Sequence, residues 1–279
     1  MENARSHAKS FFEVFHINQF MKLSIVIPCY NEDENICNLL DLILEQQFPI
    51  DSEIIIVDDG SRTPVTTYIK KYLQDPRFHH FRFRRNQGKG SALQIGFKKS
   101  KGDYVIIQDA DLEYLPSDIN ELLKLILDRK AFVVYGSRFF LKPKKMSRSH
   151  WIANRFLSIV TNVLFNSKLT DMETGYKLVN RRLLTSLHLV GREFEIEPEI
   201  TGRLLARGVP IVEVPIHYHY RQKGIAKINI ADGLEAVFML LLLKTRTKSR
   251  LLWWLYRVFK YHFKKILVKY KKIIQGLIS

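Results

Sequence analysis

The chain has 279 residues, of which 46% are hydrophobic and 26% are charged. This composition is typical of a globular protein and excludes a disordered or collagen-like chain. Two cysteines, Cys29 and Cys37, are too few for a disulfide scaffold and favour a reducing compartment. The formal net charge is +16, but residues 244–279 hold 11 Lys or Arg and no acidic residue. The first 243 residues carry 33 basic and 28 acidic groups, so most of the basicity belongs to the C-terminal segment.

Residues 1–20 show no clear periodicity, and we expect an N-terminal extension there. From residue 22, short β-branched apolar runs alternate with helical patterns. Strands are expected at 23–27, 53–57, 79–83, 103–107 and 131–135. Helices are expected at 34–46, 63–74, 89–100 and 117–129. Strands that are apolar throughout are typical of a parallel sheet covered on both faces, so this half of the chain predicts an open α/β sheet.

The pattern changes from residue 150 onwards. A helix is expected at 150–165, a strand at 211–216 and a helix at 231–244, with an irregular stretch around 170–175. A bilayer-spanning helix needs about 20 apolar residues, and the longest uninterrupted apolar run covers only 236–243. We also expect no signal peptide. The simplest division is one domain over residues 21–245, followed by a tail over 246–279.

Acidic residues follow two of the expected strands. Asp58 and Asp59 follow the second strand, and Asp109 and Asp111 follow the strand at 103–107. Ligands of open parallel sheets bind beyond the carboxyl ends of the strands. Residues two apart on an extended chain point the same way, so Asp109 and Asp111 can present oxygen ligands to one Mg²⁺ or Mn²⁺. An Asp-Ala-Asp run is also compatible with a solvated loop, but its place after a buried strand favours a site.

Four segments of the first half carry a family resemblance by their order and spacing: SIVIPCYNE at 24–32, VDDGS at 57–61, NQGKG at 86–90 and DADLE at 109–113. Together they resemble the inverting nucleotide-sugar glycosyltransferases of the GT-A fold. Further segments are similar to the dolichol-phosphate mannosyltransferase branch and its bacterial polyprenyl-phosphate relatives: YGSR at 135–138, TD at 170–171, GYK at 175–177, EPE at 197–199 and residues 221–228. The resemblance covers residues 22–245. It implies a GT-A (Rossmann-like), mostly parallel sheet flanked by helices.

The resemblance implies a donor site for a nucleotide-diphosphate sugar in the N-terminal half. Its residues would be Pro28, Tyr30, Glu32, Asp58, Asp59, Lys89, Asp109, Ala110 and Asp111. Asp109 and Asp111 would hold a metal that bridges the diphosphate, with Glu113 as a third ligand. Such a metal would neutralise charge that develops on the leaving nucleoside diphosphate. Catalysis would therefore involve Asp109 and Asp111.

The resemblance implies that the second half binds a polyprenyl phosphate acceptor. A phosphate is already anionic near neutral pH, so it needs positioning cations and no strong base. The candidate residues are Arg138, Arg155, Ser158, Arg221 and Lys227. We count Arg138 and Asp171 as catalytic, with two roles open for Asp171. It would be a general base if the acceptor were a hydroxyl, and it would position the acceptor loop or a neighbouring cation if the acceptor is a phosphate. Glu197 and Glu199 have no assigned chemical step.

The tail has a helical period over residues 250–278, with one apolar side, a basic side and two tryptophans, Trp253 and Trp254. A basic amphipathic helix with interfacial aromatic residues is typical of a membrane-surface element. We therefore expect a cytoplasmic protein attached peripherally to the cytoplasmic face of the membrane through 246–279. The alternative is a helix packed on the domain or on a second copy of the chain.

These features predict a metal-dependent inverting glycosyltransferase. It would move a hexose from a donor of the GDP-mannose or UDP-glucose type to a polyprenyl phosphate. One alternative transfers sugar to a saccharide or protein hydroxyl, with Asp171 as the base. A second alternative, of another class, is a basic nucleic-acid-binding module. The charge supports it only weakly, because no zinc-ligand spacing or aromatic RNA-binding signature is present.

Overall fold

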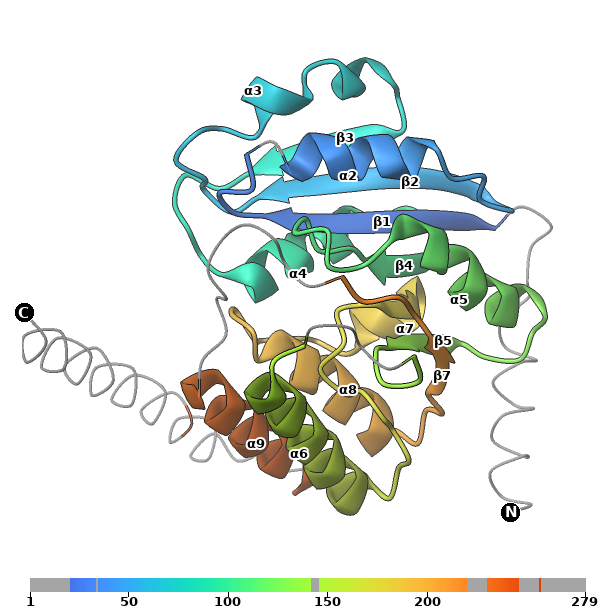
Figure 1. The fold of residues 1–279 in the computed structure, drawn as a ribbon, viewed down its shortest axis with the longest axis vertical. Coiled ribbons are helices and arrows are strands. Elements are labelled where there is room, and N and C mark those ends of the chain that lie inside the picture. The colour runs from blue at the N-terminus through green and yellow to red at the C-terminus, as the bar shows by residue number, and fades with distance from the viewer. Residues whose placement is uncertain (1–20, 34, 142–145, 220–229, 246–255, 257–279) are drawn as a thin grey trace, which may run out of the picture.

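The computed structural model describes residues 21–33, 35–141, 146–219, 230–245 and 256 (Figure 1). The expectations for residues 1–20, for almost all of the tail, and for Arg221 and Lys227 therefore lie outside the described residues. Within the described part of the chain, no helix has both the length and the apolarity that a membrane crossing requires.

One mixed sheet forms the centre of the molecule. In the described residues its strands are β1 (Lys22–Cys29), β2 (Asp51–Asp58), β3 (Phe78–Arg82), β4 (Tyr104–Ile107), β5 (Val133–Ser137), β6 (Lys177–Asn180) and β7 (Val212–Pro215). They lie in the order β3-β2-β1-β4-β6-β5-β7. Every neighbouring pair is parallel except the two pairs that β6 makes. The prediction of a mostly parallel sheet is confirmed, but the sequence pattern did not reveal β6.

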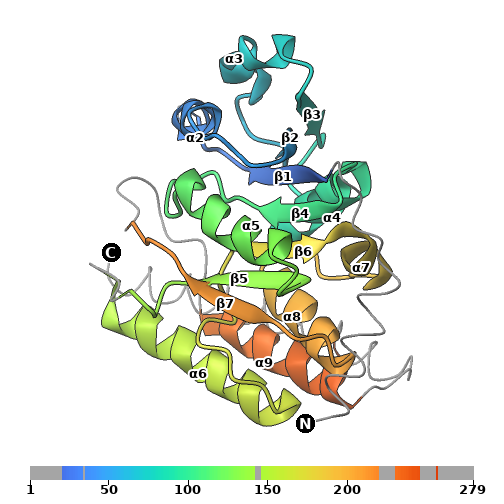
Figure 2. The same ribbon diagram turned by 90° about the vertical axis from the view of Figure 1, so that its right-hand side faces the viewer.

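Helices cover both faces of the sheet (Figure 2). One face packs on α2 (Asn35–Leu44), α3 (Thr66–Ile69) and α5 (Ile119–Leu127), together with the 3-10 turn Tyr72–Gln74. A second 3-10 turn, Pro116–Asp118, leads into α5. The other face packs on α4 (Lys89–Lys99), α7 (Arg181–Ser186) and α8 (Ile196–Ala206). Alternation along β1 explains the division, because Leu23 and Ile25 face one cluster while Val26 faces the other.

Two further helices lie beyond the sheet. α6 (Arg148–Phe165) and α9 (Ile230–Lys244) run side by side in both views, and α9 also packs on α8. A small buried cluster joins α6 and α9 through Leu157, Met172, Ala236 and Leu240. Met172 belongs to the loop between α6 and β6, so this cluster fixes that loop against the helix pair.

The reversed direction of β6 brings this loop to the candidate site. In β6, Leu178 pairs with Ile106 of β4, and Lys177 pairs with Tyr135 of β5. The amino end of β6 therefore lies where β4 and β5 reach their carboxyl ends. The residues just before β6, 170–176, meet the residues that follow β4 and β5 at one edge of the sheet.

Candidate active site

The loop after β2 is held by Asp58, whose side chain is fully buried. Its carboxylate accepts hydrogen bonds from the backbone N–H groups of Ser61, at 2.8 Å, and Val65, at 3.1 Å. It also forms an ion pair with Arg82, whose Nε lies 3.0 Å away. Through these contacts, Asp58 fixes the conformation of the loop after β2. Its contact with a bound nucleotide stays a prediction.

Asp59 holds the loop that leads into α4. Its carboxylate accepts hydrogen bonds from the backbone N–H groups of Gln87, at 2.7 Å, and Gly88, at 2.9 Å, and from Nδ2 of Asn86, at 3.0 Å. The backbone N–H of Asp59 donates to the carbonyl of Cys29 at the end of β1. Asp59 thus joins the ends of β1 and β2 to the start of α4, the region where we expect the nucleoside.

The expected base and ribose residues lie on the loop after β1. Pro28 and Tyr30 are partly exposed, whereas Glu32 is buried and accepts a hydrogen bond from Nδ2 of Asn35 at 3.4 Å. The sheet order places this loop beside the loops that follow β2 and β4. The structure therefore brings the predicted donor residues to one edge of the sheet.

Lys89, the first residue of α4, lies against the carboxylate of Asp109. Its Nζ is 2.8 Å from one carboxylate oxygen and 3.0 Å from the other. The same Nζ lies 3.1 Å from Oε1 of Glu197, whose Oε2 accepts from Nζ of Lys177 at 2.7 Å. Burial alone would lower the pKa of Lys89, but the carboxylates of Asp109 and Glu197 outweigh it and raise that pKa. Four alternating charges, Asp109, Lys89, Glu197 and Lys177, form a continuous chain under the sheet edge.

The Asp-Ala-Asp segment makes a tight turn after β4. Ala110 is buried, and Leu112 has a left-handed backbone with a φ of +62°. The backbone N–H of Glu113 donates to Oδ1 of Asp111 at 3.2 Å. Among the described residues, no group of three or more His, Cys, Asp or Glu side chains is arranged to hold a metal ion. A joint metal site of Asp109, Asp111 and Glu113 therefore stays a prediction.

The backbone at the start of α4 lies in close contact with the backbone carbonyl of Arg192. Gly88 has a φ of +99°, and a Cβ added there would lie 2.3 Å from the carbonyl oxygen of Arg192. The N–H of Ser91 donates to that same carbonyl at 3.0 Å. The segment that supplies Arg192 is held in turn by Glu199, whose carboxylate accepts from the N–H of Gly191 at 2.7 Å. The second glutamate of the Glu-Pro-Glu motif thus supports the backbone that positions Lys89.

Arg138, which follows β5, forms a bidentate ion pair with Asp171. Nε and Nη2 of Arg138 donate to the two carboxylate oxygens at 2.7 and 2.6 Å, and its backbone N–H donates at 3.0 Å. The side chains are 9% and 0% exposed. Burial lowers the pKa of Arg138, but the charge of Asp171 reverses this effect and holds that pKa well above its ordinary value.

Asp171 is held in its turn by Glu213 of β7. The Glu213 carboxylate accepts from the backbone N–H groups of Thr170, at 2.7 Å, and Asp171, at 2.9 Å. Burial raises the pKa of Glu213, and these backbone hydrogen bonds oppose that rise. Sequence reasoning missed Glu213, because one polar residue on a partly exposed strand gives no signal of its partner 42 residues earlier in the chain.

The other described acceptor candidates lie on α6. Nη1 of Arg155 donates to the carbonyl of Thr170 at 3.2 Å, and its guanidinium lies over the ring of Phe139. Ser158 is only 1% exposed, and its Oγ accepts from the backbone N–H of Met172 at 3.0 Å. Arg155 thus lies beside the Arg138–Asp171 pair, whereas Ser158 holds the loop between α6 and β6 through the backbone of Met172. Contact of either residue with a phosphate stays a prediction.

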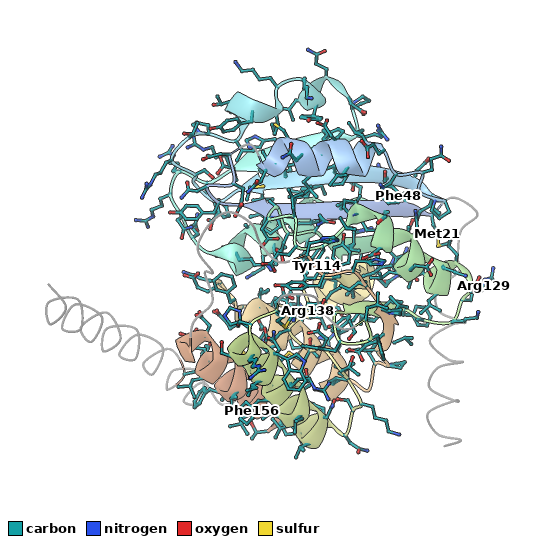
Figure 3. The ribbon with its side chains drawn as sticks, in the orientation of Figure 1. Met21, Phe48, Tyr114, Arg129, Arg138 and Phe156 are labelled. Carbon is teal, nitrogen blue, oxygen red and sulfur yellow. The ribbon has the colours of Figure 1, made fainter. Side chains whose placement is uncertain are left out.

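Two aromatic rings lie between the expected donor and acceptor residues. Tyr114 stacks on Tyr176 with a centroid separation of 4.9 Å, and its hydroxyl accepts from the N–H of Gly175 at 3.3 Å. Tyr114 and Arg138 lie close together near the middle of Figure 3. Burial raises the pKa of Tyr114, and the charge of Arg138 opposes that rise. A Cβ on Gly175 would lie 2.5 Å from Oδ2 of Asp109, so the loop before β6 directly contacts the expected donor side.

Residues 24–187, more than half of the chain, match the family described as Glycosyl transferase family 2. The chain belongs to this family. As a family 2 glycosyltransferase it is an enzyme, and the nucleic-acid-binding alternative is not supported.

Two of the relatives of this chain have names that state an activity on a polyprenyl phosphate. It is 25% identical over 229 residues to dodecaprenyl-phosphate galacturonate synthase of Rhizobium johnstonii, covering 80% of this chain and 66% of the relative. It is 29% identical over 233 residues to dolichol-phosphate mannosyltransferase of Pyrococcus furiosus, covering 79% and 64%. The chain spans about two thirds of the length of these two relatives.

A solved structure shares the fold of this family 2 domain. Glucosyl-3-phosphoglycerate synthase from Mycobacterium tuberculosis, in complex with Mn²⁺, uridine diphosphate and glucosyl-3-phosphoglycerate, matches with a TM-score of 0.63 and 19% identity. The match covers 85% of this chain and 88% of that one. The likeness confirms the GT-A-like architecture that the sequence motifs implied.

Proposed function

We propose that this family 2 enzyme transfers a hexose from a nucleoside-diphosphate sugar to a polyprenyl phosphate, with inversion at the anomeric carbon and with Mg²⁺ or Mn²⁺. The named activities of the two relatives support the class of acceptor. The observation that carries the choice of acceptor is the ion pair of Arg138 and Asp171, in which both carboxylate oxygens of Asp171 accept from the guanidinium. A carboxylate held in this way is poorly suited to take a proton from a hydroxyl, whereas a phosphate acceptor needs no base.

On the donor side, Asp109 and Asp111, with Glu113 beside them, are the residues that would hold the divalent cation. Their oxygen donors are of the type that Mg²⁺ and Mn²⁺ prefer. The ammonium of Lys89 against both oxygens of Asp109 supports the fit, because it shows that this carboxylate accepts a cation. The metal, when bound, would neutralise charge on the departing diphosphate. Lys89 would add a second positive charge next to the same group.

On the acceptor side, Arg138 would hold the phosphate in line with the anomeric carbon. An acceptor oxygen would form the new bond to that carbon as the bond to the diphosphate breaks on the opposite face, which inverts the configuration. No proton has to be removed from the acceptor. Asp171 and Glu213 would fix the direction of the Arg138 guanidinium, and Arg155 would add charge from α6. Arg221 and Lys227 remain proposed partners outside the described residues.

Exposed apolar side chains on α6 support a lipid acceptor. Trp151, Ile152, Phe156 and Ile159 are between 45% and 60% exposed, and Phe156 points outward from α6 in Figure 3. Arg155 lies within this run. A polyprenyl chain beside these side chains would leave its phosphate near Arg155 and Arg138. We retain the proposal that residues 246–279 attach the protein to the membrane surface.

The test compares two acceptors that differ only in the reacting group. The purified full-length chain is incubated with Mn²⁺ and radiolabelled GDP-mannose or UDP-glucose, and with either a polyprenyl phosphate or the matching polyprenol. We expect label in the lipid extract with the phosphate only, and a product with inverted anomeric configuration by NMR. Transfer to the polyprenol, or to a saccharide acceptor in a parallel assay, would overturn the proposed acceptor.

A further inference from the structure

Lys89 lies where a divalent cation would bind Asp109. Its Nζ contacts both oxygens of that carboxylate, at 2.8 and 3.0 Å. A metal ion and an ammonium group cannot both occupy this position, because two cations at one carboxylate repel each other and compete for the same lone pairs. A metal ion bound by both oxygens of Asp109 therefore has to displace Nζ of Lys89 from this position.

The structure provides a second carboxylate for the displaced lysine. Oε1 of Glu197 already lies 3.1 Å from Nζ of Lys89. Glu197 is itself 3% exposed, and its other oxygen is bound by Lys177. Lys177 is fully buried and donates to the backbone carbonyls of Met172 and Thr174. Glu197 is thus fixed, and it can retain Lys89 after Lys89 leaves Asp109.

The backbone of Lys89 has little freedom to move with the side chain. Asp59 binds the N–H groups of Gln87 and Gly88, and the carbonyl of Arg192 covers Gly88 from the other side. The change of partner therefore has to occur by rotation of the lysine side chain alone. Such a rotation around a fixed Glu197 keeps the ammonium group close to the donor site.

Charge balance determines when this change is favourable. Asp109, Lys89, Glu197 and Lys177 together carry no net charge, so Lys89 already balances the charge of Asp109, and a bare divalent cation has only Asp111 and Glu113 as further anionic ligands. A nucleoside diphosphate brings negative charge with it and offers Lys89 a new anionic partner. The metal and the nucleotide should therefore bind with positive coupling, and the coupling should pass through Lys89.

We infer that Lys89 occupies the cation position at Asp109 in the donor-free enzyme, and that Glu197 is the positioning residue that retains Lys89 when metal and diphosphate enter together. The inference rests on the proposed function for the metal and the diphosphate, but it does not depend on the acceptor. It assigns a role to the first glutamate of the Glu-Pro-Glu motif. It also makes the resting enzyme selective for a metal–nucleotide pair over free metal.

The test measures Mn²⁺ binding to the full-length chain by electron paramagnetic resonance, with and without GDP and UDP and without any acceptor. In the wild type, nucleotide should tighten Mn²⁺ binding strongly. Lys89→Met should bind bare Mn²⁺ about tenfold more tightly or better, as expected when one close like charge is removed from a partly buried site. The same variant should lose most of the tightening that nucleotide causes. Lys89→Gln serves as a second variant if Lys89→Met does not fold.

Two further variants separate this mechanism from a general effect of charge. Lys98→Met removes an exposed lysine from the same helix and should leave both Mn²⁺ affinities unchanged. Glu197→Gln leaves Lys89 with Asp109 as its one carboxylate partner, so bare Mn²⁺ should bind more weakly than in the wild type. Unchanged affinity for bare Mn²⁺ in the Lys89 variants would overturn the inference, as would the absence of Mn²⁺ binding in every variant even with nucleotide. Failure of the proposed acceptor would instead appear in the lipid assay while the Mn²⁺ results stood.

Discussion

Asp171 is the residue on which the two interpretations of the reaction differ. The sequence left it as a base or as a positioning group, and the structure surrounds it with Arg138 and Glu213. Its side chain is fully buried. These contacts favour the positioning role, in which Asp171 acts on the reaction through the direction of the Arg138 guanidinium.

Asp171→Asn should therefore weaken acceptor binding more than it changes the chemistry. We expect an increased KM for polyprenyl phosphate and a kcat reduced by about 10- to 100-fold, the size of a positioning error at a reacting centre. The pH profile of kcat should keep its shape, because no proton transfer is lost. Loss of the acidic limb of the pH profile, with near-complete loss of turnover at saturating acceptor, would instead identify Asp171 as a general base. Asp128→Asn, at an exposed position after the last residue of α5, is a control for loss of one carboxylate charge.

Glu173 predicts a pH dependence of stability. Burial, together with the nearby charges of Glu197 and Asp171, raises its pKa from 4.5 to about 7, although Lys177 and Arg138 oppose the rise. Its Oε1 is buried and has no hydrogen-bond partner among the described residues. Between pH 4.5 and about 7 the folded chain retains a proton that the unfolded chain has released. The free energy of unfolding therefore falls as the pH rises through this window.

Glu173→Gln should remove this dependence. Relative to the wild type, the variant should be more stable at pH 8 than at pH 5, by a difference of about 1–3 kcal/mol. Urea unfolding at the two pH values measures it, and Glu45→Gln, at an exposed position after α2, is the matched control. Equal effects of Glu173→Gln at both pH values would contradict the assignment.

At the scale of the elements, α4 packs closely against the sheet. A Cβ built on Gly96 would lie 2.2 Å from Cγ1 of Val26 on β1. The helix that carries Lys89 thus lies against the central strand with no room for another methyl group. This contact sets the depth of α4 and hence the reach of Lys89 toward Asp109.

Gly96→Ala should destabilise the fold by about 1–3 kcal/mol, the usual cost of overpacking. Adding Val26→Ala should restore part of that loss, because it removes the clashing methyl groups. Gly233→Ala in α9 is the counterpart, since nothing lies within 4 Å of a Cβ there. It should stabilise the chain by about 0.5–1 kcal/mol through helix propensity. Thermal unfolding of the variants measures all three effects, and a neutral Gly96→Ala would show that α4 can move away from the sheet.

Which elements could be predicted from the sequence depended on their length and burial. β1, β2 and β4 are buried apolar runs, and their positions agree with the pattern. The helix expected at 63–74 is instead α3 and a separate 3-10 turn, in a segment rich in β-branched residues that form helix poorly. β6 and α7 are short, and α8 carries a proline in its first turn, so none of them has a clear period.

The residues of the candidate site also divide into those that the sequence predicted and those that it did not. Residues placed by strand ends, such as Asp59, Asp109 and Arg138, lie at the expected edge of the sheet. Contacts between distant segments could not be predicted, because one chain gives no signal of which charges will pair. The links of Glu213 to Asp171 and of Glu197 to Lys89 are of this kind.

At the scale of the whole molecule, one residue within the expected tail, 246–279, belongs to the packed body. Tyr256 lies beyond the expected domain boundary at residue 245, yet it is 5% exposed and stacks on Phe238 of α9 at 5.6 Å. A truncation that removes Tyr256 would therefore disturb α9. The tail is best tested from residue 258 onwards.

Deleting residues 258–279 removes six lysines. Each contributes about 1 kcal/mol near an anionic lipid surface. The truncated chain should lose most of its binding to vesicles that contain phosphatidylglycerol, while GDP or UDP still raises its thermal stability. Co-sedimentation with these vesicles measures the loss, and neutral vesicles serve as the control. Undiminished binding to the anionic vesicles would assign membrane attachment to another surface.

The reversed strand β6 has a consequence for how such an enzyme can diversify. Under the proposed function, the segments that leave β1, β2 and β4 would build the pocket for the activated sugar, whereas the segment that enters β6 would meet Arg138, after β5, on the side of the recipient. Exchange of residues 166–174 would then alter the recipient side and leave the sugar pocket in place. Chimaeras that graft this stretch from a family member with another recipient are the natural way to redirect the enzyme.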